Sequence, residues 1–140
     1  YALEHAGEPR ASLDRAEAAL RQAFERGPRE PLAWLVQGEV QGLRARWLAR
    51  QQRARAEDFE AAAHAFEEAL ELEPERLDYR VAFGHFCHAW AMWRRTAGLE
   101  PRPALERGLA LADEALASRP RWADALRLRA SLREATGPTR

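Results

Sequence analysis

Three prolines divide the sequence at equal distances. Pro28, Pro74 and Pro120 follow one another at intervals of 46 residues. When the sequence is shifted by 46 residues against itself, small and apolar residues coincide at fixed distances from each proline. The coincident sets are Ala16, Ala62 and Gly108; Leu20, Phe66 and Ala112; Ala23, Ala69 and Ala115; and Gly38, Gly84 and Ala130. Self-similarity at a fixed period of this length predicts stacked helical units.

Small residues and prolines at these positions have a physical reason in paired helices. The residues twelve and five positions before each proline are Ala or Gly, with a position between them that is large in the first two units. This alternation lets two antiparallel helices approach closely and interlock. The proline then ends the second helix, because it cannot continue the hydrogen-bond ladder. Gly38, Gly84 and Ala130 are predicted to mark a second close contact, since glycine inside a helix costs about 1 kcal/mol relative to alanine.

The composition favours helices throughout. Ala, Leu, Arg and Glu are abundant and form helices well, while Ile is absent and Val and Thr are rare. We therefore predict an all-α fold. The 22 basic residues are all Arg and balance 22 acidic residues, so the net charge exerts no general attraction for nucleic acid or anionic membranes. Because Lys is absent, the segment holds no Schiff-base, phosphate-loop or kinase lysine.

The remaining composition bears on location. The single cysteine excludes a disulfide framework, and no apolar run reaches the ~18 residues of a membrane span. The first residues lack the charged head and apolar run of a signal peptide. We therefore expect a cytoplasmic location, no membrane contact and no cofactor, and we interpret the chain, which starts at Tyr1, as a piece of a longer protein.

Helix start and stop signals give a coarse map of the chain. The predicted helices are 10–26, 31–50, 56–72, 76–96, 103–118 and 121–135, with the stub of an earlier helix at 1–6. Loops at 7–9 and 98–103 contain Gly and Pro, which end helices. The corresponding stretch 50–56 has neither residue, so the sequence leaves open where the preceding helix ends.

Both helices of the middle unit carry residues of a known repeat pattern. They are Trp34 and Gly38 in the first helix and Ala62, Phe66, Ala69 and Pro74 in the second. These residues resemble the tetratricopeptide repeat, whose period is 34 residues. The longer period here would lengthen the helices and the inner turn. The resemblance implies a right-handed solenoid of helical hairpins with about three extended repeats of period 46. We expect one domain over 1–140, with units at 1–30, 31–76 and 77–120 and a capping helix at 121–136.

A narrower resemblance concerns the turn at residues 98–105. Its sequence, Gly-Leu-Glu-Pro-Arg-Pro-Ala-Leu, is echoed at residues 7–13 and is similar to the inner turn of long repeats that follow the kinase domain in large bacterial serine/threonine kinases. This implies that the chain is the C-terminal docking or regulatory region of a signalling kinase. The chain itself lacks a glycine-rich phosphate loop, a His-Arg-Asp and an Asp-Phe-Gly motif. We therefore expect no catalytic residue in it and no enzyme activity of its own.

The tetratricopeptide resemblance also implies a ligand groove, lined by the first helix of each hairpin. The family's groove positions fall in three rows. They are Leu32, Leu35, Glu39, Gly42 and Leu43; Asp78, Val81, His85, His88 and Ala89; and Asp124, Arg127, Ser131 and Glu134. The first row is largely apolar and the others are polar, which suits an extended peptide or amphipathic helix with an apolar anchor at one end. The alternative is that the chain mainly stacks with neighbouring repeats of its parent protein.

One cluster contains potential metal ligands. His85 and His88 stand three residues apart, hence on one helical face, and could share a metal. Cys87 points about 100° away from His88 and is predicted to be a small buried core residue. His64 is predicted to lie on a second helix that faces away from the groove. We therefore expect the two histidines to be polar groove residues, with no metal site.

Charge is uneven along the chain. Residues 40–56 carry five Arg and no acid, whereas residues 57–75 carry eight acids and no base. A basic stripe with Trp47 for stacking would suit single-stranded RNA. We favour mutual neutralisation instead, because the two blocks lie on consecutive antiparallel helices, and we do not expect nucleic acid as a ligand. The tryptophans of the first helices are predicted to fill the core between units. They are Trp34, Trp47, Trp90 and Trp93.

Overall fold

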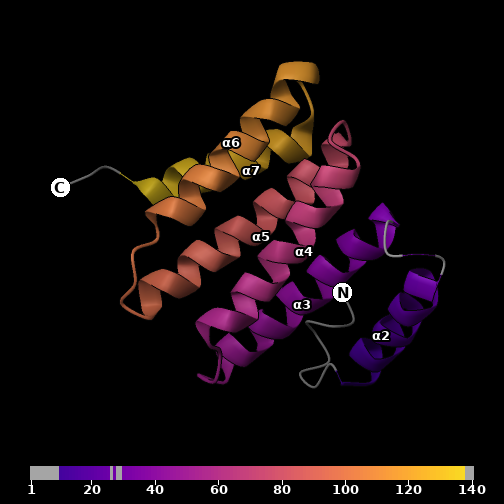
Figure 1. The fold of residues 1–140 in the computed structure, drawn as a ribbon. Helices are drawn as coiled ribbons and strands as arrows, with labels where there is room; N and C mark the ends of the chain where they lie inside the picture. The colour runs from indigo at the N-terminus through magenta and orange to yellow at the C-terminus, as the bar shows by residue number, and fades with distance from the viewer. Residues whose placement is uncertain (1–9, 26, 28–29, 138–140) are drawn as a thin grey trace. The chain divides into compact units, whose positions relative to one another are not determined.

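The computed structural model describes residues 10–25, 27 and 30–137, which form α-helices joined by short turns (Figure 1). The helices are α2 (Arg10–Glu25), α3 (Pro31–Arg50), α4 (Ala56–Leu72), α5 (Leu77–Thr96), α6 (Arg102–Ser118) and α7 (Ala123–Thr136). No strand occurs among the described residues, which confirms the all-α prediction. Each helix begins and ends within two residues of its predicted position. The predicted stub at 1–6 lies outside the described residues.

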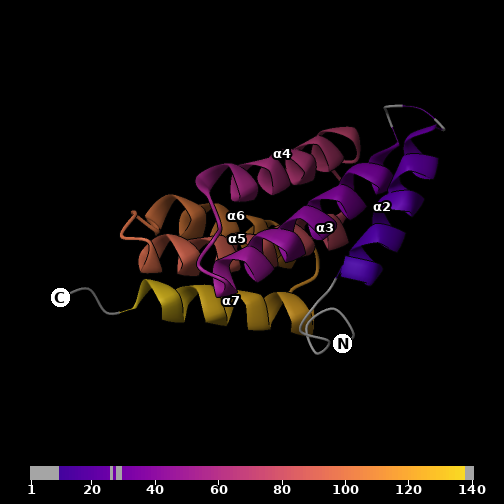
Figure 2. The same ribbon diagram turned by 90° about the horizontal axis from the view of Figure 1, so that it is seen from below.

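The chain divides into two compact units, residues 1–74 and 75–140. In the first unit α3 and α4 form an antiparallel hairpin, and α2 packs against α3 (Figures 1 and 2). Apolar residues of α2 and α3 meet in a small core, which consists of Leu13, Leu20, Ala33 and Val40. Phe24 packs at the edge of this core, with its ring 5.1 Å from that of Trp34.

In the second unit α5 and α6 form the hairpin, and α7 packs against both of them. The core of this unit draws on all three helices. Its buried members are Val81, Ala91, Ala104, Leu105, Ala112, Ala115, Leu116, Ala125, Leu128 and Leu132. Burial of one such leucine removes enough apolar surface to stabilise the unit by about 2 kcal/mol.

Close helix packing occurs at Gly38 and Gly84, as the sequence predicts for both glycines. A Cβ atom on Gly38 would lie 2.9 Å from the ring of Phe66 on α4. A Cβ atom on Gly84 would lie 2.5 Å from a methyl group of Leu128 on α7. Both distances are shorter than real Cβ contacts, so these two positions accept only glycine unless a neighbour moves.

The end of α3, which the sequence left open, is set by backbone hydrogen bonds. The helix ends at Arg50, and Gln52 adopts a left-handed conformation with φ of 58°. The amide of Gln52 donates to the carbonyl of Ala49 (3.0 Å), and the amide of Arg53 donates to that of Leu48 (2.8 Å). This pair of bonds is the Schellman motif, which normally places glycine at the left-handed position.

The same motif ends α5, with glycine in that place. Gly98 has φ of 78°. Its amide donates to the carbonyl of Arg95 (3.2 Å), and the amide of Leu99 donates to that of Arg94 (2.7 Å). The turns of the two hairpins therefore have the same geometry. In the first hairpin the left-handed residue is Gln52, and glutamine does not predict such a turn from the sequence.

Gln52, the residue with positive φ that follows α3, should therefore lower the stability of the fold. Gln52→Gly should raise the free energy of unfolding by about 0.5–1 kcal/mol, because glycine adopts positive φ without a steric penalty. Gly98→Gln should lower it by a similar amount. Gln51→Gly is the matched control, since Gln51 has φ of −89° and needs no glycine. Urea denaturation of the four proteins measures these differences, and a Gln52→Gly protein no more stable than the parent would contradict the turn geometry.

The close contact at Gly38 makes a second prediction. Alanine in a helix is normally favoured over glycine by about 1 kcal/mol. Here Gly38→Ala should instead destabilise the chain by about 1–3 kcal/mol, because the new methyl group collides with the buried ring of Phe66. The double variant Gly38→Ala with Phe66→Leu should lose less than the sum of the two single variants. Thermal denaturation with a double-mutant cycle tests this, and additive losses would show that the two residues do not touch.

Candidate functional site

The second and third predicted groove rows meet in the second unit, on α5 and α7. An imidazole nitrogen of His85 lies 3.0 Å from a carboxylate oxygen of Asp124. The guanidinium group of Arg127 lies 3.8 Å from the same oxygen. All three side chains are substantially exposed, with exposed fractions of 49 % for His85, 44 % for Asp124 and 72 % for Arg127. We call His85, Asp124, Arg127 and the exposed Ser131 the α5–α7 polar face.

The other residues of these two rows have different environments. Val81 is buried and belongs to the core of the second unit, so its contribution is packing between helices. His88 and Ala89 are half-buried on α5, and Glu134 is exposed on α7. The exposed surface that these rows offer to a ligand is therefore polar.

Asp78 lies at the start of α5 and is held by a neighbouring arginine. The guanidinium group of Arg76 donates two hydrogen bonds to the carboxylate of Asp78, at 2.9 and 2.6 Å. These bonds hold the pKa of Asp78 below its usual value. The first turn of a helix also favours a negative charge. Arg76 in addition stacks on the ring of Tyr79, 4.4 Å from its centroid, which fixes the guanidinium plane.

The first predicted row lies on α3, in the first unit. Leu32 is exposed (54 %), whereas Leu35 is buried (9 %). Gly42 is buried and Leu43 is half-buried. Glu39 is exposed, but the protein atoms around its carboxyl group desolvate it and raise its pKa above the usual value. Leu32 is thus the apolar side chain of this row that is open to a ligand.

The cluster around Cys87 is divided between two environments. Cys87 is fully buried, which confirms the prediction of a core residue. Its Cβ atom lies 3.2 Å from where a Cβ on Gly108 of α6 would stand. His64 is exposed on α4, with its ring 6.0 Å from that of Trp34. Within the described part of the chain, no three His, Cys, Asp or Glu side chains are grouped so that they could hold a metal ion.

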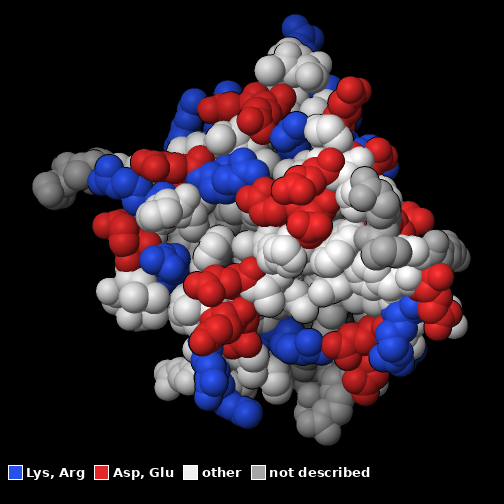
Figure 3. All heavy atoms as spheres, in the orientation of Figure 1, with Lys and Arg blue, Asp and Glu red and all other residues white. Residues whose placement is uncertain are grey.

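The charged blocks pair less simply than predicted. Arg44 of the basic block forms an ion pair with Glu17 on α2, and not with a carboxylate of α4. Asp58 of the acidic block accepts a hydrogen bond from the amide of Arg55 (2.7 Å) and so caps the start of α4. For the rest of both blocks, mutual neutralisation stays a prediction. On the face in Figure 3, acidic and basic side chains lie interspersed.

Trp90 is half-buried on α5, and the filling of the core between units by tryptophans stays a prediction. Its ring lies 5.6 Å from that of Phe86 on the same helix, and it packs against the core of the second unit. Trp47 and Trp93, which stand 46 residues apart, are half-buried. Aromatic side chains of this size bury a large area each, which suits the packing of long paired helices.

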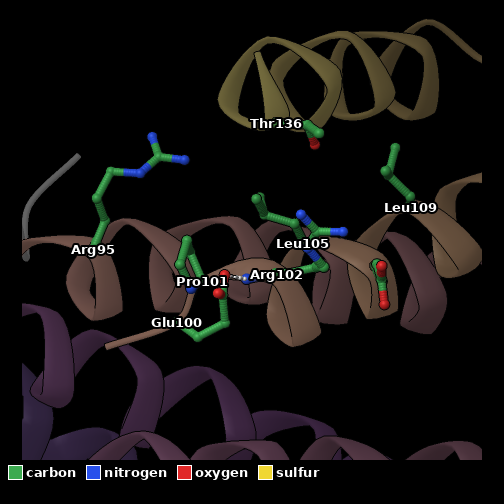
Figure 4. A pocket seen from close by; sticks show the side chains of 8 residues that line it. Arg95, Glu100, Pro101, Arg102, Leu105, Leu109 and Thr136 are labelled. Carbon is green, nitrogen blue, oxygen red and sulfur yellow. Dashed lines mark hydrogen bonds between the residues drawn. The ribbon is translucent and has the colours of Figure 1, made fainter. Parts of the chain in front are cut away.

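A cavity that sequence reasoning missed lies in the second unit, where α5 and α7 end and α6 begins (Figure 4). Its volume is about 380 Å³, and it is lined by Arg95, Glu100, Pro101, Arg102, Leu105, Glu106, Leu109 and Thr136. Arg95 donates a hydrogen bond to the carbonyl of Ala135 (2.6 Å), which ties α5 to the end of α7. The feature of the sequence that could have pointed to this cavity is the turn at 98–105, which supplies four of the lining residues. Two Arg and two Glu line the cavity, so its charges do not favour an anionic ligand over a cationic one.

Among the residues described here, no helix is both long enough and apolar enough to cross a bilayer. No family model, curated protein or solved structure matches the chain.

The ion pair at Asp78 gives a pH prediction. Because its pKa is depressed in the folded state, the pair stabilises the fold above the unfolded-state pKa, and this contribution is lost as the pH falls through the folded-state pKa. The carboxylate is exposed, so the effect on stability should stay below about 0.5 kcal/mol. The sharper measurement is the titration of the carboxyl carbon by NMR. Arg76→Gln should raise the midpoint towards the ordinary value, whereas Arg102→Gln, beyond the far end of α5, should leave it unchanged. An unchanged midpoint in Arg76→Gln would contradict the assignment.

Proposed function

We propose that the chain is a non-catalytic interaction scaffold, a solenoid of about three extended tetratricopeptide-like hairpins that binds a peptide or partner helix along its first helices. The observation that carries this proposal is the regular spacing of the helices. First helices begin at residues 31, 77 and 123, and second helices begin at 10, 56 and 102, so every interval is 46 residues. The shared turn geometry at Gln52 and Gly98, also 46 residues apart, supports the same architecture.

The α5–α7 polar face is suited to the backbone of a peptide. An extended peptide offers amide donors and carbonyl acceptors along its length. The face presents donors on Arg127, acceptors on Asp124, and His85 and Ser131, which can serve as either. The contact between His85 and Asp124 joins two helices and limits the freedom of both side chains. A face held in this way loses less conformational entropy when a ligand binds.

Two features of the chain fit the proposed binding role. The chain contains no Lys. Its one thiol, on Cys87, is buried, whereas a nucleophilic cysteine needs partial exposure and an electropositive surrounding. In our proposal the chain acts in the cytoplasm and stacks with neighbouring repeats of a parent protein, and neither nucleic acid nor a membrane is its ligand.

A second candidate, compatible with the first, is that the chain is the docking or regulatory region of a bacterial serine/threonine kinase. The turn at residues 98–105 favours it, because this segment resembles the inner turn of kinase-associated repeats. The upstream sequence of the parent gene tests this candidate. His-Arg-Asp and Asp-Phe-Gly motifs there would support it, and further helical repeats alone would contradict it.

The peptide-binding proposal is tested with a phage-displayed library of random peptides panned against the chain. Enriched peptides should bind the parent chain and lose at least about tenfold in affinity for the double variant His85→Glu with Arg127→Glu, because two contacts to the peptide become repulsive. Both side chains are exposed, so the melting temperature should change little. Leu35 is unsuitable for this test, because a charge at a buried site would unfold the chain.

Ala110→Glu is the matched control, since Ala110 is exposed on α6, a second helix of a hairpin. Peptides that bind the double variant as well as the parent chain would contradict the assignment of the face. A library that yields no binding peptide at all would contradict the peptide-binding role itself.

A further inference from the structure

The contact between His85 and Asp124 determines which nitrogen of the histidine ring carries the hydrogen. The Nε2 atom of His85 lies 3.0 Å from a carboxylate oxygen of Asp124. An ionised carboxylate accepts hydrogen bonds and donates none, so Nε2 has to supply the hydrogen of this bond. In a neutral imidazole one nitrogen is a donor and the other an acceptor. The Nδ1 atom of His85 is therefore left as a hydrogen-bond acceptor.

Two features favour the negative charge of Asp124 on which this assignment depends. Asp124 lies in the first turn of α7, where the helix dipole stabilises an anion. The guanidinium group of Arg127, which stays protonated in proteins, lies 3.8 Å from the same carboxylate oxygen. Asp124 thus meets His85 as an acceptor only, and it acts as a positioning residue for the imidazole ring.

The histidine ring is open to a ligand on the side away from Asp124. His85 is half-exposed on α5. Within the described ranges of the chain, Asp124 is the one side chain that joins His85 by a hydrogen bond or an ion pair. The acceptor on Nδ1 is therefore left for a group from outside the chain.

Other charged or titratable side chains on α5 and α6 have different contacts or are partly covered, so they leave the pairing of His85 with Asp124 intact. They are Glu114 of α6, which pairs with Arg80 at 2.9 Å; Arg107 of α6, which lies over the ring of Phe83; Asp78 of α5, which is held by Arg76; and His88, which is half-buried on α5.

We propose that Asp124 holds His85 as a hydrogen-bond acceptor, through Nδ1, for an N–H group of the bound peptide, and that the face releases this peptide when His85 gains a proton. The inference rests on the proposed peptide-binding function and adds the polarity and the regulation of one of its contacts. A protonated imidazole has two N–H donors and no acceptor, so its Nδ1 would meet the peptide N–H donor to donor. Histidine changes its charge between about pH 5 and 8. Binding is therefore expected to weaken as the pH falls through this range.

The position of the hydrogen is measured on the free chain, without a peptide. In a chain labelled with nitrogen-15, NMR at about pH 8 distinguishes a ring nitrogen that carries hydrogen from one that does not. The signals that disappear in His85→Gln belong to His85. We expect the hydrogen of neutral His85 on Nε2. In Asp124→Asn the form with hydrogen on Nδ1 should increase, because an amide side chain both donates and accepts.

His64, which is exposed on α4, is the internal control in these spectra and should not respond to Asp124→Asn. A parent chain that carries the hydrogen of neutral His85 mainly on Nδ1 would overturn the inference. Equal proportions of the two forms in the parent chain and in Asp124→Asn would overturn the positioning role of Asp124.

The acceptor role is measured with a peptide from the panning described above, performed at about pH 7.5. The probe is the most enriched sequence without His, Asp or Glu, acetylated and amidated at its ends, so that the pH dependence belongs to the chain. By isothermal titration calorimetry, its Kd at about pH 5 should be at least about tenfold higher than at about pH 7.5. His85→Gln should lose most of this difference, because its amide oxygen accepts a hydrogen bond and does not titrate. His64→Gln is the matched control and should keep it.

The outcomes separate this inference from the function on which it rests. A probe that binds equally well at both pH values, or a His85→Gln chain that keeps the pH dependence, would overturn the acceptor role and leave the peptide-binding function intact. A library that yields no binding peptide would contradict the function and the acceptor role together, whichever nitrogen carries the hydrogen. Weaker binding at the lower pH in the parent and His64→Gln chains, but not in His85→Gln, would support the inference.

Discussion

The close approach of paired helices at small residues is the contact on which the rest of the structure depends. Where Gly38 faces Phe66, and where Gly108 faces Cys87, two helical backbones come near enough for side chains of one to touch the axis of the other. Closeness of this kind removes water along the length of a hairpin and makes apolar burial efficient even with many alanines. It also fixes the rotation of each helix, because the small residue of the contact has to face the neighbouring helix.

That fixed rotation decides which side chains become surface. In the second unit the side of α7 that carries Leu128 and Leu132 enters the core. The neighbouring side then places Asp124 beside His85 of α5. Ion pairs at the rim, such as Arg129 with Asp113 of α6 (3.5 Å), contribute little free energy because they are solvated. These ion pairs orient surface side chains, whereas apolar packing determines how the helices are arranged.

Much of the fold follows from the sequence, because helix boundaries are marked by local chemistry. Prolines, small residues at regular intervals and the scarcity of β-branched residues predict each described helix to within two residues. The turn that follows α3 lacks such a signal. Its left-handed residue is Gln52, and glutamine at that position carries no signal of its own. There the tertiary fold imposes a backbone conformation that the local sequence does not favour.

The candidate site was less predictable, because the regular spacing of residues in the sequence suggests positions for side chains but not their environments. Val81 and His85 stand four residues apart on α5, yet one lies in the core and the other on the surface. The partner of Arg44 lies on α2, a helix that charge counting along the chain did not consider. Pairing between distant side chains depends on helix rotation and on reach, which only three-dimensional packing defines.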